Sequence, residues 1–581
     1  MSPELQRARS RQMIIFLLIC VLMFALLGRL YYWQVMRGPQ LAKWANDEHI
    51  QNQVVDAPRG VIYDSLGVVL ATNVVRDDVY VEPIQFTSDY TDAEKAQVEL
   101  QNIVTKLHKA LPDLTAEQLT KFFSSGRATV RIASLISPEQ SQQLRASRIP
   151  YTFLEPRTIR VYPSGTLAAQ ILGYVQPDKG GLYGIEGSYD KLLAGTAGSF
   201  TAETDLNGNP LTVGASSTQP VIDGANVTLS IDSTIQYLVQ QALEERVQQT
   251  EALGGTATVI DVRTGAIVAM VGAPSFDPNV YSKYYDKRGC LDSLSVYFNP
   301  VLMCTYEPGS TMKGITLAAA LDQGVVTPNT TIDDPGVISF PDAVAVANWE
   351  YQAHGTESMT QILDYSANVG AAKVAHDFLT AKRYYPYLER FGFGQRTNVG
   401  GIEASGGYRT PTSQGWTPSD LTRQAFGQSI TATPLQVVLA YASIANQGTM
   451  MRPYLVQQVD NNGKVTKTSP QVLRQVISQK AAQQMIQMLT SAADYNKQVV
   501  VPGYSVAAKS GTATTQGVSD DLTEASIAGF LPASNPRYAI LVTLDHPRST
   551  IYGGTAAAPL WNKIAEQVMW HYHVPSDRPV K

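Results

Sequence analysis

An uncharged, almost wholly apolar run from Met13 to Gly28 constrains the architecture of this chain more than any other feature. A helix that crosses a bilayer needs roughly 20 residues, although about 17 can suffice. Arg11 and Arg29 can extend their apolar stems along such a helix, and an aromatic stretch follows at 31–33. The run therefore predicts a single transmembrane anchor over residues 13–33.

The charges beside this run predict its orientation. Arg7, Arg9 and Arg11 precede it, and cytoplasmic flanks are rich in such residues. Residues 1–12 are therefore expected to form a short cytoplasmic tail, with nearly all the mass outside the cell. A cleaved signal peptide is the alternative, but no small-residue cleavage site follows the run, so an uncleaved anchor is favoured. No later stretch is apolar enough to predict a second span.

The composition narrows the class of protein. A net charge of −5 and a pI of about 5.9 argue against a nucleic-acid partner. Charged residues make up 16% of the chain, below the roughly 25% of average globular proteins, which suits an exported domain. A length of 581 residues allows several domains.

Three short motifs follow one another along the chain. They have the patterns S-x-x-K, S-x-N and K-[ST]-G, at Ser310–Lys313, Ser366–Asn368 and Lys509–Thr512. A second S-x-x-K pair, Ser188–Lys191, has no partner motifs in the right order. The S-x-N pattern occurs once, between the other two. The ordered set is therefore far more specific than any one motif.

The first motif suits nucleophilic catalysis. A serine hydroxyl is a poor nucleophile until a neighbouring base takes its proton. Ser310 opens an apolar helical pattern, and Lys313 lies three residues on, on the same helix face. A lysine among apolar groups and another cation loses basicity and can act as a base. The alternative is an ordinary capped helix with a solvated lysine.

The other two motifs suit substrate binding. Asn368 offers an amide that can bind a peptide group, and the Ser366 hydroxyl can relay a proton. The third motif follows an apolar, strand-like stretch at 504–508. Its Gly511 would let a substrate backbone approach closely, while Lys509 and the hydroxyls of Ser510 and Thr512 suit a carboxylate. A polar turn ending a strand is the alternative for this motif.

With these motifs the chain resembles the class B penicillin-binding proteins, which are monofunctional D,D-transpeptidases of peptidoglycan synthesis. The resemblance extends to Arg59–Asp64, Arg160–Pro163, Gly184–Gly187 and Ala273–Asn279. It implies that Ser310 is the nucleophile, Lys313 the base, and Ser366 and Asn368 the proton shuttle and a substrate contact. It also implies carboxylate binding by Lys509, Ser510 and Thr512, an oxyanion hole from the Ser310 and Thr512 N–H groups, and no cofactor.

The resemblance also implies an α/β (α+β) fold in two extracytoplasmic parts. Residues 34–224 are expected to form a mixed α/β pedestal of the dimerisation type, and 225–581 a transpeptidase domain. A hairpin is predicted around the turn at 263–265 and a core strand at 538–544. Helical patterns lie between them, which fits an antiparallel sheet with an inserted helical subdomain. Thr115 and Ser137 begin capping patterns of two pedestal helices.

The cysteines leave two possibilities open. Cys20 lies in the predicted span, whereas Cys290 and Cys304 lie outside it, in the segment before Ser310. An exported pair can form a disulfide, or both can remain free thiols. No H-E-x-x-H pattern occurs, and no metal site is predicted.

The resemblance predicts an enzyme of the plasma (inner) membrane that cross-links stem peptides ending in D-Ala-D-Ala and that β-lactams acylate. A D,D-carboxypeptidase and a serine β-lactamase are competing hydrolases; the E-x-x-L-N pattern of the latter occurs here only at 203–207, before Ser310. A β-lactam sensor, or a scaffold without turnover, is the non-enzymatic alternative.

Two further expectations concern cellular role and partner. The run Ser366–Gly370 resembles division-type enzymes, so a division role is slightly favoured over elongation. The sequence contains no glycosyltransferase motif. The resemblance then implies a separate multi-spanning membrane glycosyltransferase as the partner.

Overall fold

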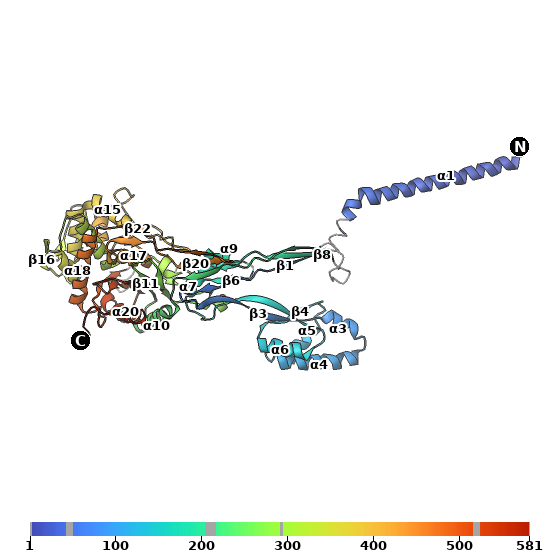
Figure 1. Ribbon diagram of the computed structural model, residues 1–581, viewed down its shortest axis with the longest axis horizontal. Helices are drawn as coiled ribbons and strands as arrows, with labels where there is room; N and C mark the ends of the chain where they lie inside the picture. The colour runs from blue at the N-terminus through green and yellow to red at the C-terminus, as the bar shows by residue number, and fades with distance from the viewer. Residues whose placement is uncertain are drawn as a thin grey trace. The chain divides into compact units, whose positions relative to one another are not determined.

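The computed structural model (Figure 1) describes residues 3–41, 44, 50–177, 179–203, 216–290, 294–514 and 523–579. The chain divides into two compact units. The first comprises Met1–Pro58 and Gly195–Gly224, and the second comprises Arg59–Ala194 and Ala225–Lys581.

The first unit contains the apolar helix and a small sheet. Helix α1 (Pro3–Tyr31) continues into a π-helical turn, η1 (Tyr32–Met36). Over Arg11–Met36 it is long and apolar enough to cross a membrane. The sheet has the order β1–β8–β9, with antiparallel strands at Ile50–Val55, Gly198–Glu203 and Ser216–Gln219. The E-x-x-L-N pattern noted in the sequence at 203–207 lies outside the described residues except for Glu203.

The second unit begins with a seven-stranded sheet of order β21–β20–β10–β2–β3–β4, in which β5 also pairs with β3. Its strands are β2 (Ile62–Tyr63), β3 (Val69–Val81), β4 (Val130–Ile136), β5 (Thr152–Val161), β10 (Asn226–Leu229), β20 (Val456–Asn461) and β21 (Lys464–Lys467). Strands β10, β20 and β21 come from beyond residue 224. This sheet therefore draws strands from both sides of that predicted boundary.

Four helices accompany the longest strands of this sheet: α3 (Pro83–Asp89), α4 (Ala93–Ala110), α5 (Ala116–Phe123) and α6 (Pro138–Ser147). Their apolar faces share a core with β3 and β4 that includes Leu107, Leu119 and Val79. The predicted capping boxes at Thr115 and Ser137 are confirmed: each hydroxyl accepts the backbone N–H three residues on. Short elements follow at α7 (Ala169–Leu172), β6 (Tyr174–Gln176), β7 (Gly180–Leu182), α8 (Gly184–Ser188) and α9 (Asp190–Leu193).

A five-stranded antiparallel sheet forms the centre of the C-terminal part of the second unit, in the order β12–β11–β25–β24–β23. Its strands are β11 (Gly254–Asp261), β12 (Ile267–Ala273), β23 (Ala507–Thr514), β24 (Thr523–Leu531) and β25 (Tyr538–Asp545). The predicted hairpin and core strand are confirmed. The strand predicted at 504–508 begins instead at Ala507 and continues through the third motif, because each residue from 507 to 514 is paired with β24.

Helices cover both faces of this sheet. Helices α10 (Ser233–Thr250) and α20 (Ala558–His571) share one apolar core with it, and α12 (Met312–Asp322) and α17 (Pro434–Ala445) share the other. The predicted helical insertion is confirmed, since most helices of this part lie between β12 and β23.

Among the described residues, the remaining α-helices and strands of the insertion are α11 (Pro300–Met303), β13 (Thr331–Asp334), β14 (Val337–Ile338), β15 (Val346–Ala347), β16 (Gly355–Ser358), α13 (Met359–Asp364), α14 (Asn368–Lys373), α15 (Thr380–Arg390), β17 (Gly407–Tyr408), α16 (Pro418–Gln424), β18 (Ile430–Thr431), β19 (Thr449–Met451), β22 (Val472–Gln475) and α18 (Gln479–Asn496). Helix α19 (Gly553–Ala556) follows the sheet.

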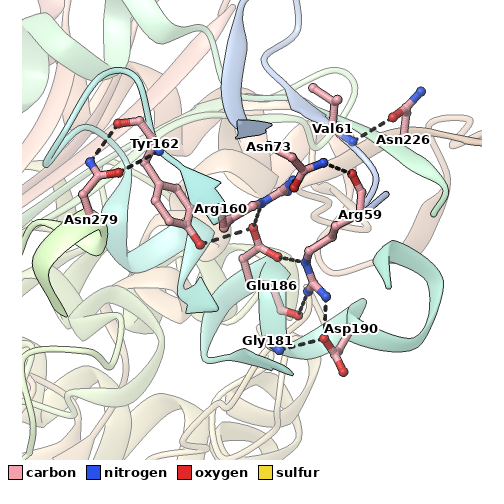
Figure 2. Close-up of polar contacts among 10 residues, drawn as sticks. All are labelled: Arg59, Val61, Asn73, Arg160, Tyr162, Gly181, Glu186, Asp190, Asn226 and Asn279. Atoms are coloured by element: carbon pink, nitrogen blue, oxygen red, sulfur yellow. Dashed lines mark hydrogen bonds and ion pairs between the residues drawn. The ribbon is translucent and has the colours of Figure 1, made fainter. Parts of the chain in front are cut away.

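A buried ion-pair network connects three of the segments that resemble family motifs (Figure 2). The Glu186 carboxylate is fully buried and lies 2.6 Å from Arg59 Nε and 2.7 Å from Arg160 Nε. Arg59 also pairs with Asp190 at 2.8 Å. Asn279 extends the network by bonding both the backbone N–H and the carbonyl of Tyr162. Segments distant in the sequence are thus fixed to one another within the second unit.

Candidate active site

The first motif lies at the start of α12. Ser310 is in a single 3₁₀ turn, Gly309–Thr311, and the α-helix itself begins at Met312. Lys313 is fully buried, and its Nζ atom lies 2.9 Å from Ser310 Oγ. The one-turn spacing therefore places the amine beside the hydroxyl, the arrangement that a nucleophile and its base require.

The surroundings of Lys313 favour its neutral form. Burial lowers the pKa of the Lys313 amine well below its usual value, and the positive charge of Lys509 lowers it further. Negative charge on Asp334, or on Glu357 when it is ionised, acts in the opposite direction. Because the lowering effects are larger, the neutral form of Lys313, whose lone pair can accept a proton from Ser310, is favoured relative to that of an exposed lysine.

The second motif approaches the same lysine from another segment. Ser366 precedes α14 and has φ of +59°, a left-handed conformation that is uncommon for serine. Its Oγ atom lies 3.2 Å from Lys313 Nζ, and Lys313 also donates to the Ser366 carbonyl. The Asn368 side chain donates to the Ala347 carbonyl at 3.0 Å, which holds the amide at the start of α14.

The third motif lies in β23, the last strand of the five-stranded sheet. Lys509 is buried, and burial lowers the pKa of its amine to about 8, although Asp364 opposes this shift. Its Nζ donates to the Ser510 carbonyl at 3.2 Å. Ser510 and Thr512 are partly exposed. The Thr512 hydroxyl accepts the backbone N–H of Gly553 at 3.0 Å.

Glycines let the first and third motifs approach backbone to backbone. Gly309 has φ of +55°, and a Cβ atom there would lie 2.9 Å from the Thr512 carbonyl oxygen. A Cβ atom on Gly511 would come 2.7 Å from the carbonyl oxygen of Pro308. Side chains at either position would separate the Ser310 turn from β23.

The structure thus brings together all eight residues that the sequence analysis assigned to the site. Sequence reasoning missed the groups that support them. Asn348 accepts the Val369 N–H at 2.9 Å and donates to Asp334 at 2.6 Å, and Glu357 is buried nearby. No local pattern marks these residues, because they reach the site only through the pairing of β13 with β16 and the adjoining loop. Within the described ranges, no cluster of His, Cys, Asp or Glu could hold a metal ion.

A disulfide lies in the segment that precedes Ser310. Cys290 and Cys304 are paired, with Cα atoms 6.2 Å apart and a separation of 14 residues in the chain. The bond closes the loop that ends at α11, just before the Ser310 turn. Of the two possibilities that the sequence left open, the structure contains the pair, while Cys20 is free.

Family comparisons account for nearly all of the chain outside its N-terminal helix. The penicillin-binding protein transpeptidase domain matches residues 255–566, and the penicillin-binding protein dimerisation domain matches residues 54–229.

Individual relatives align with this chain over almost its full length. The chain is 30% identical to stage V sporulation protein D of Bacillus subtilis, covering 95% of this chain and 84% of that protein. It is 28% identical to the peptidoglycan D,D-transpeptidase FtsI of Escherichia coli, covering 95% and 90%. The structure of penicillin-binding protein 3 of Mycobacterium tuberculosis with aztreonam superposes with a TM-score of 0.67, at 27% identity, over 91% of this chain and 99% of that one. The chain therefore belongs to the penicillin-binding protein transpeptidases, and its paired dimerisation and transpeptidase domains make it a class B member.

Proposed function

We propose that Ser310 carries out peptidoglycan D,D-transpeptidation through a covalent acyl-enzyme. The observation that carries this proposal is the position of one buried amine, that of Lys313, within hydrogen-bonding distance of both the Ser310 and the Ser366 hydroxyls. A base placed between two hydroxyls can take a proton from one and pass it on through the other.

In the first half-reaction, Ser310 Oγ attacks the carbonyl carbon of the penultimate D-Ala while Lys313 accepts the hydroxyl proton. The tetrahedral oxyanion is stabilised by the backbone N–H groups of Ser310 and Thr512. The C–N bond then breaks, and the terminal D-Ala leaves as an amine that receives a proton from Lys313 through Ser366. The product is an ester between Ser310 and the stem peptide.

In the second half-reaction, an amine of a neighbouring stem attacks this ester carbonyl. The amine loses a proton to Lys313 as the new C–N bond forms. The ester C–O bond breaks, and Ser310 Oγ recovers the proton. Lys313 thus ends the cycle in the form in which it began.

Substrate binding is assigned to the residues around this centre. Lys509, Ser510 and Thr512 bind the terminal carboxylate, Gly511 lets the peptide backbone approach β23, and Asn368 binds a peptide amide. A β-lactam carries a strained amide and a carboxylate and takes the same place. Its ring opens on Ser310 without releasing a leaving group.

Two measurements test the assignment. Labelling with a fluorescent penicillin, followed by peptide mapping, should place the acyl group on Ser310. Incubation with a D-Ala-D-Ala stem peptide and an amine acceptor should release D-Ala and form the cross-linked dimer. If D-Ala is released but no cross-linked dimer forms, because water alone resolves the acyl-enzyme, the protein is a carboxypeptidase instead. Labelling by penicillin without any turnover of the stem peptide would identify a sensor or scaffold.

We further propose a role in cell division. The proteins that the chain matches include ones named FtsI and stage V sporulation protein D, and the run Ser366–Gly370 resembles division-type enzymes. A fluorescently tagged copy should gather at the septum during growth. A signal spread along the side wall would support an elongation role.

The N-terminal helix is proposed to be a single-pass anchor with residues 1–12 in the cytoplasm. Residues 34–224 would form the pedestal and residues 225–581 the extracytoplasmic transpeptidase domain. The proposed partner is a multi-spanning glycosyltransferase that docks on the anchor and pedestal. In a reconstituted pair, full-length protein should stimulate glycan polymerisation more than a soluble form starting near Trp33, although both should be labelled by penicillin. Equal stimulation by the two forms would disprove this coupling.

A further inference from the structure

A fully buried pair of carboxyl groups lies next to the proposed catalytic centre. Glu357 in β16 and Asp334 in β13 are both completely inaccessible to solvent. The two strands are antiparallel, with Ile332 opposite Glu357, so Asp334 is the diagonal neighbour of Glu357 on the same face. Neither residue belongs to the three motifs.

The two acids differ in their hydrogen-bond partners. Asp334 accepts the Gly336 N–H at 2.8 Å and the Asn348 side-chain amide at 2.6 Å, the pattern of an ionised carboxylate. Among the described residues, no N–H or hydroxyl group donates to either oxygen of Glu357. The Glu357 carboxyl group lies close enough to that of Asp334 to hydrogen-bond, and a hydrogen bond between two carboxyl groups needs a proton on one of them. The proton therefore belongs on Glu357, which can donate it to Asp334.

The position of Glu357 links this pair to the second motif. A Cβ atom on Gly370, in α14, would lie only 2.5 Å from Glu357 Oε1, so the acid packs directly on that helix. Asp334 reaches the same helix through Asn348, which accepts the N–H of Val369 at 2.9 Å. Asn368 is the first residue of α14, next to Val369. The pair thus supports the segment that presents Ser366 and Asn368.

Glu357 also lies close enough to Lys313 for their charges to interact. The titratable groups that face Glu357 are Asp334 from β13 and Lys313 from α12, and Lys509 from β23 acts on Lys313 in turn. A protonated Glu357 adds no negative charge beside Lys313. An ionised Glu357 would stabilise the ammonium form of Lys313 and would repel Asp334.

We propose that Glu357 is a positioning residue for acyl transfer: protonated against Asp334, it holds the start of α14 in place and keeps a second negative charge away from Lys313. This inference rests on the proposed role of Lys313 as the base. Burial, together with the neighbouring charge of Asp334, raises the pKa of Glu357 to about 8, so its proton is lost only in alkaline solution.

The test compares wild-type protein with Glu357→Gln, measuring the second-order rate of acylation by a fluorescent penicillin from pH 6 to 9.5. Glutamine is a neutral isostere whose side-chain N–H can still donate to Asp334. The ratio of the variant rate to the wild-type rate should be within about twofold of 1 at pH 7. It should rise to about threefold or more at pH 9, where only the wild type gains the extra charge. Lys509 loses its proton in both proteins, so its effect cancels in the ratio.

Three controls complete the experiment. Glu357→Leu removes the hydrogen bond and should lower acylation about tenfold or more at pH 7, provided that circular dichroism shows a folded protein. Glu566→Gln, an exposed change on α20, should give a ratio of 1 at every pH. A Glu357→Gln ratio that does not vary with pH, or one below about 0.1 at pH 7, would overturn the proposal. A wild type that is not acylated at Ser310 would instead overturn the proposed function, and this proposal with it.

Discussion

The Lys313 amine lies 2.9 Å from the Ser310 hydroxyl and 3.2 Å from the Ser366 hydroxyl, and so the helix that carries Lys313 and the loop that carries the second motif share a single amine. The two hydroxyls come from segments 56 residues apart in the sequence numbering, yet each lies within 3.2 Å of the same Nζ atom. Removing one of these groups should therefore affect a specific step rather than the fold.

Ser310→Ala should abolish covalent labelling by penicillin while leaving the unfolding midpoint nearly unchanged, because only one partly exposed hydroxyl is removed. Gel fluorescence and thermal unfolding measure the two effects. Ser188→Ala, in the other S-x-x-K pair, is the matched control and should be labelled normally. Labelling that persists in Ser310→Ala would contradict the assignment.

Lys313→Ala should slow acylation by about 10²–10⁴-fold, the usual loss when a general base is removed. Stopped-flow or quenched labelling gives the rate. Removing a long buried side chain also creates a cavity, so Lys313→Met serves as the matched variant of similar length. A rate close to wild type in either variant would mean that another group takes the proton.

Acylation by a carboxylate-bearing penicillin should fall above about pH 8. The pKa of Lys509 is lowered to about 8 by burial, so this amine is charged below that pH and neutral above it. The neutral form attracts the ligand carboxylate less. Lys509→Arg keeps its charge throughout this range and should make the alkaline decline of the second-order rate shallower. An identical decline in both proteins would exclude Lys509 as its source.

Glu186→Gln should destabilise the second unit by about 3–5 kcal/mol, because Arg59 and Arg160 would lose the carboxylate between them (Figure 2). Urea unfolding measures the change. Lys563→Ala breaks an exposed pair with Glu245 and should cost no more than about 1 kcal/mol. Similar losses in the two variants would show that burial of the Glu186 network adds nothing.

Replacing both Cys290 and Cys304 by serine should lower the free energy of unfolding by about 3 kcal/mol, the chain-entropy value for a loop of roughly 15 residues. Wild type treated with a reductant should match the double variant. Non-reduced peptide mass spectrometry checks the bond directly, and two free thiols in exported protein would refute the pairing.

Much of this architecture could be predicted from local patterns. The capping residues Thr115 and Ser137, the hairpin around residues 263–265 and the S-x-x-K spacing are all short-range signals, and each reflects interactions within a few residues. The start of β23 was misplaced because apolar residues at 504–506 resemble a strand, whereas pairing with β24 begins only at Ala507.

The supporting residues could not be predicted in the same way. In the sequence, Asp190 stands out only as a residue inside the Ser188–Lys191 pair. In the structure its carboxylate accepts a hydrogen bond from Arg59 at 2.8 Å, although the two residues are 131 positions apart. Asn348 bonds to α14 directly, and Asp334 reaches it through Asn348. Both positions depend on the pairing of β13 with β16 and on the adjoining loop, which no periodic pattern in the sequence predicts. Such contacts depend on the tertiary arrangement of the chain, which single-sequence patterns do not encode.

In the proposed reaction, the place of β23 at the end of its sheet lets one site accept both a long polymer and a small drug. A terminal strand offers main-chain N–H and C=O groups to any ligand that carries an amide, irrespective of side chains. Recognition of this kind tolerates drastic shortening of the ligand, as long as an amide and a carboxylate remain in register with Ser310 and Lys509. Recognition through the main chain, which lets the enzyme act on cell-wall peptides of varied sequence, therefore also lets antibiotics bind.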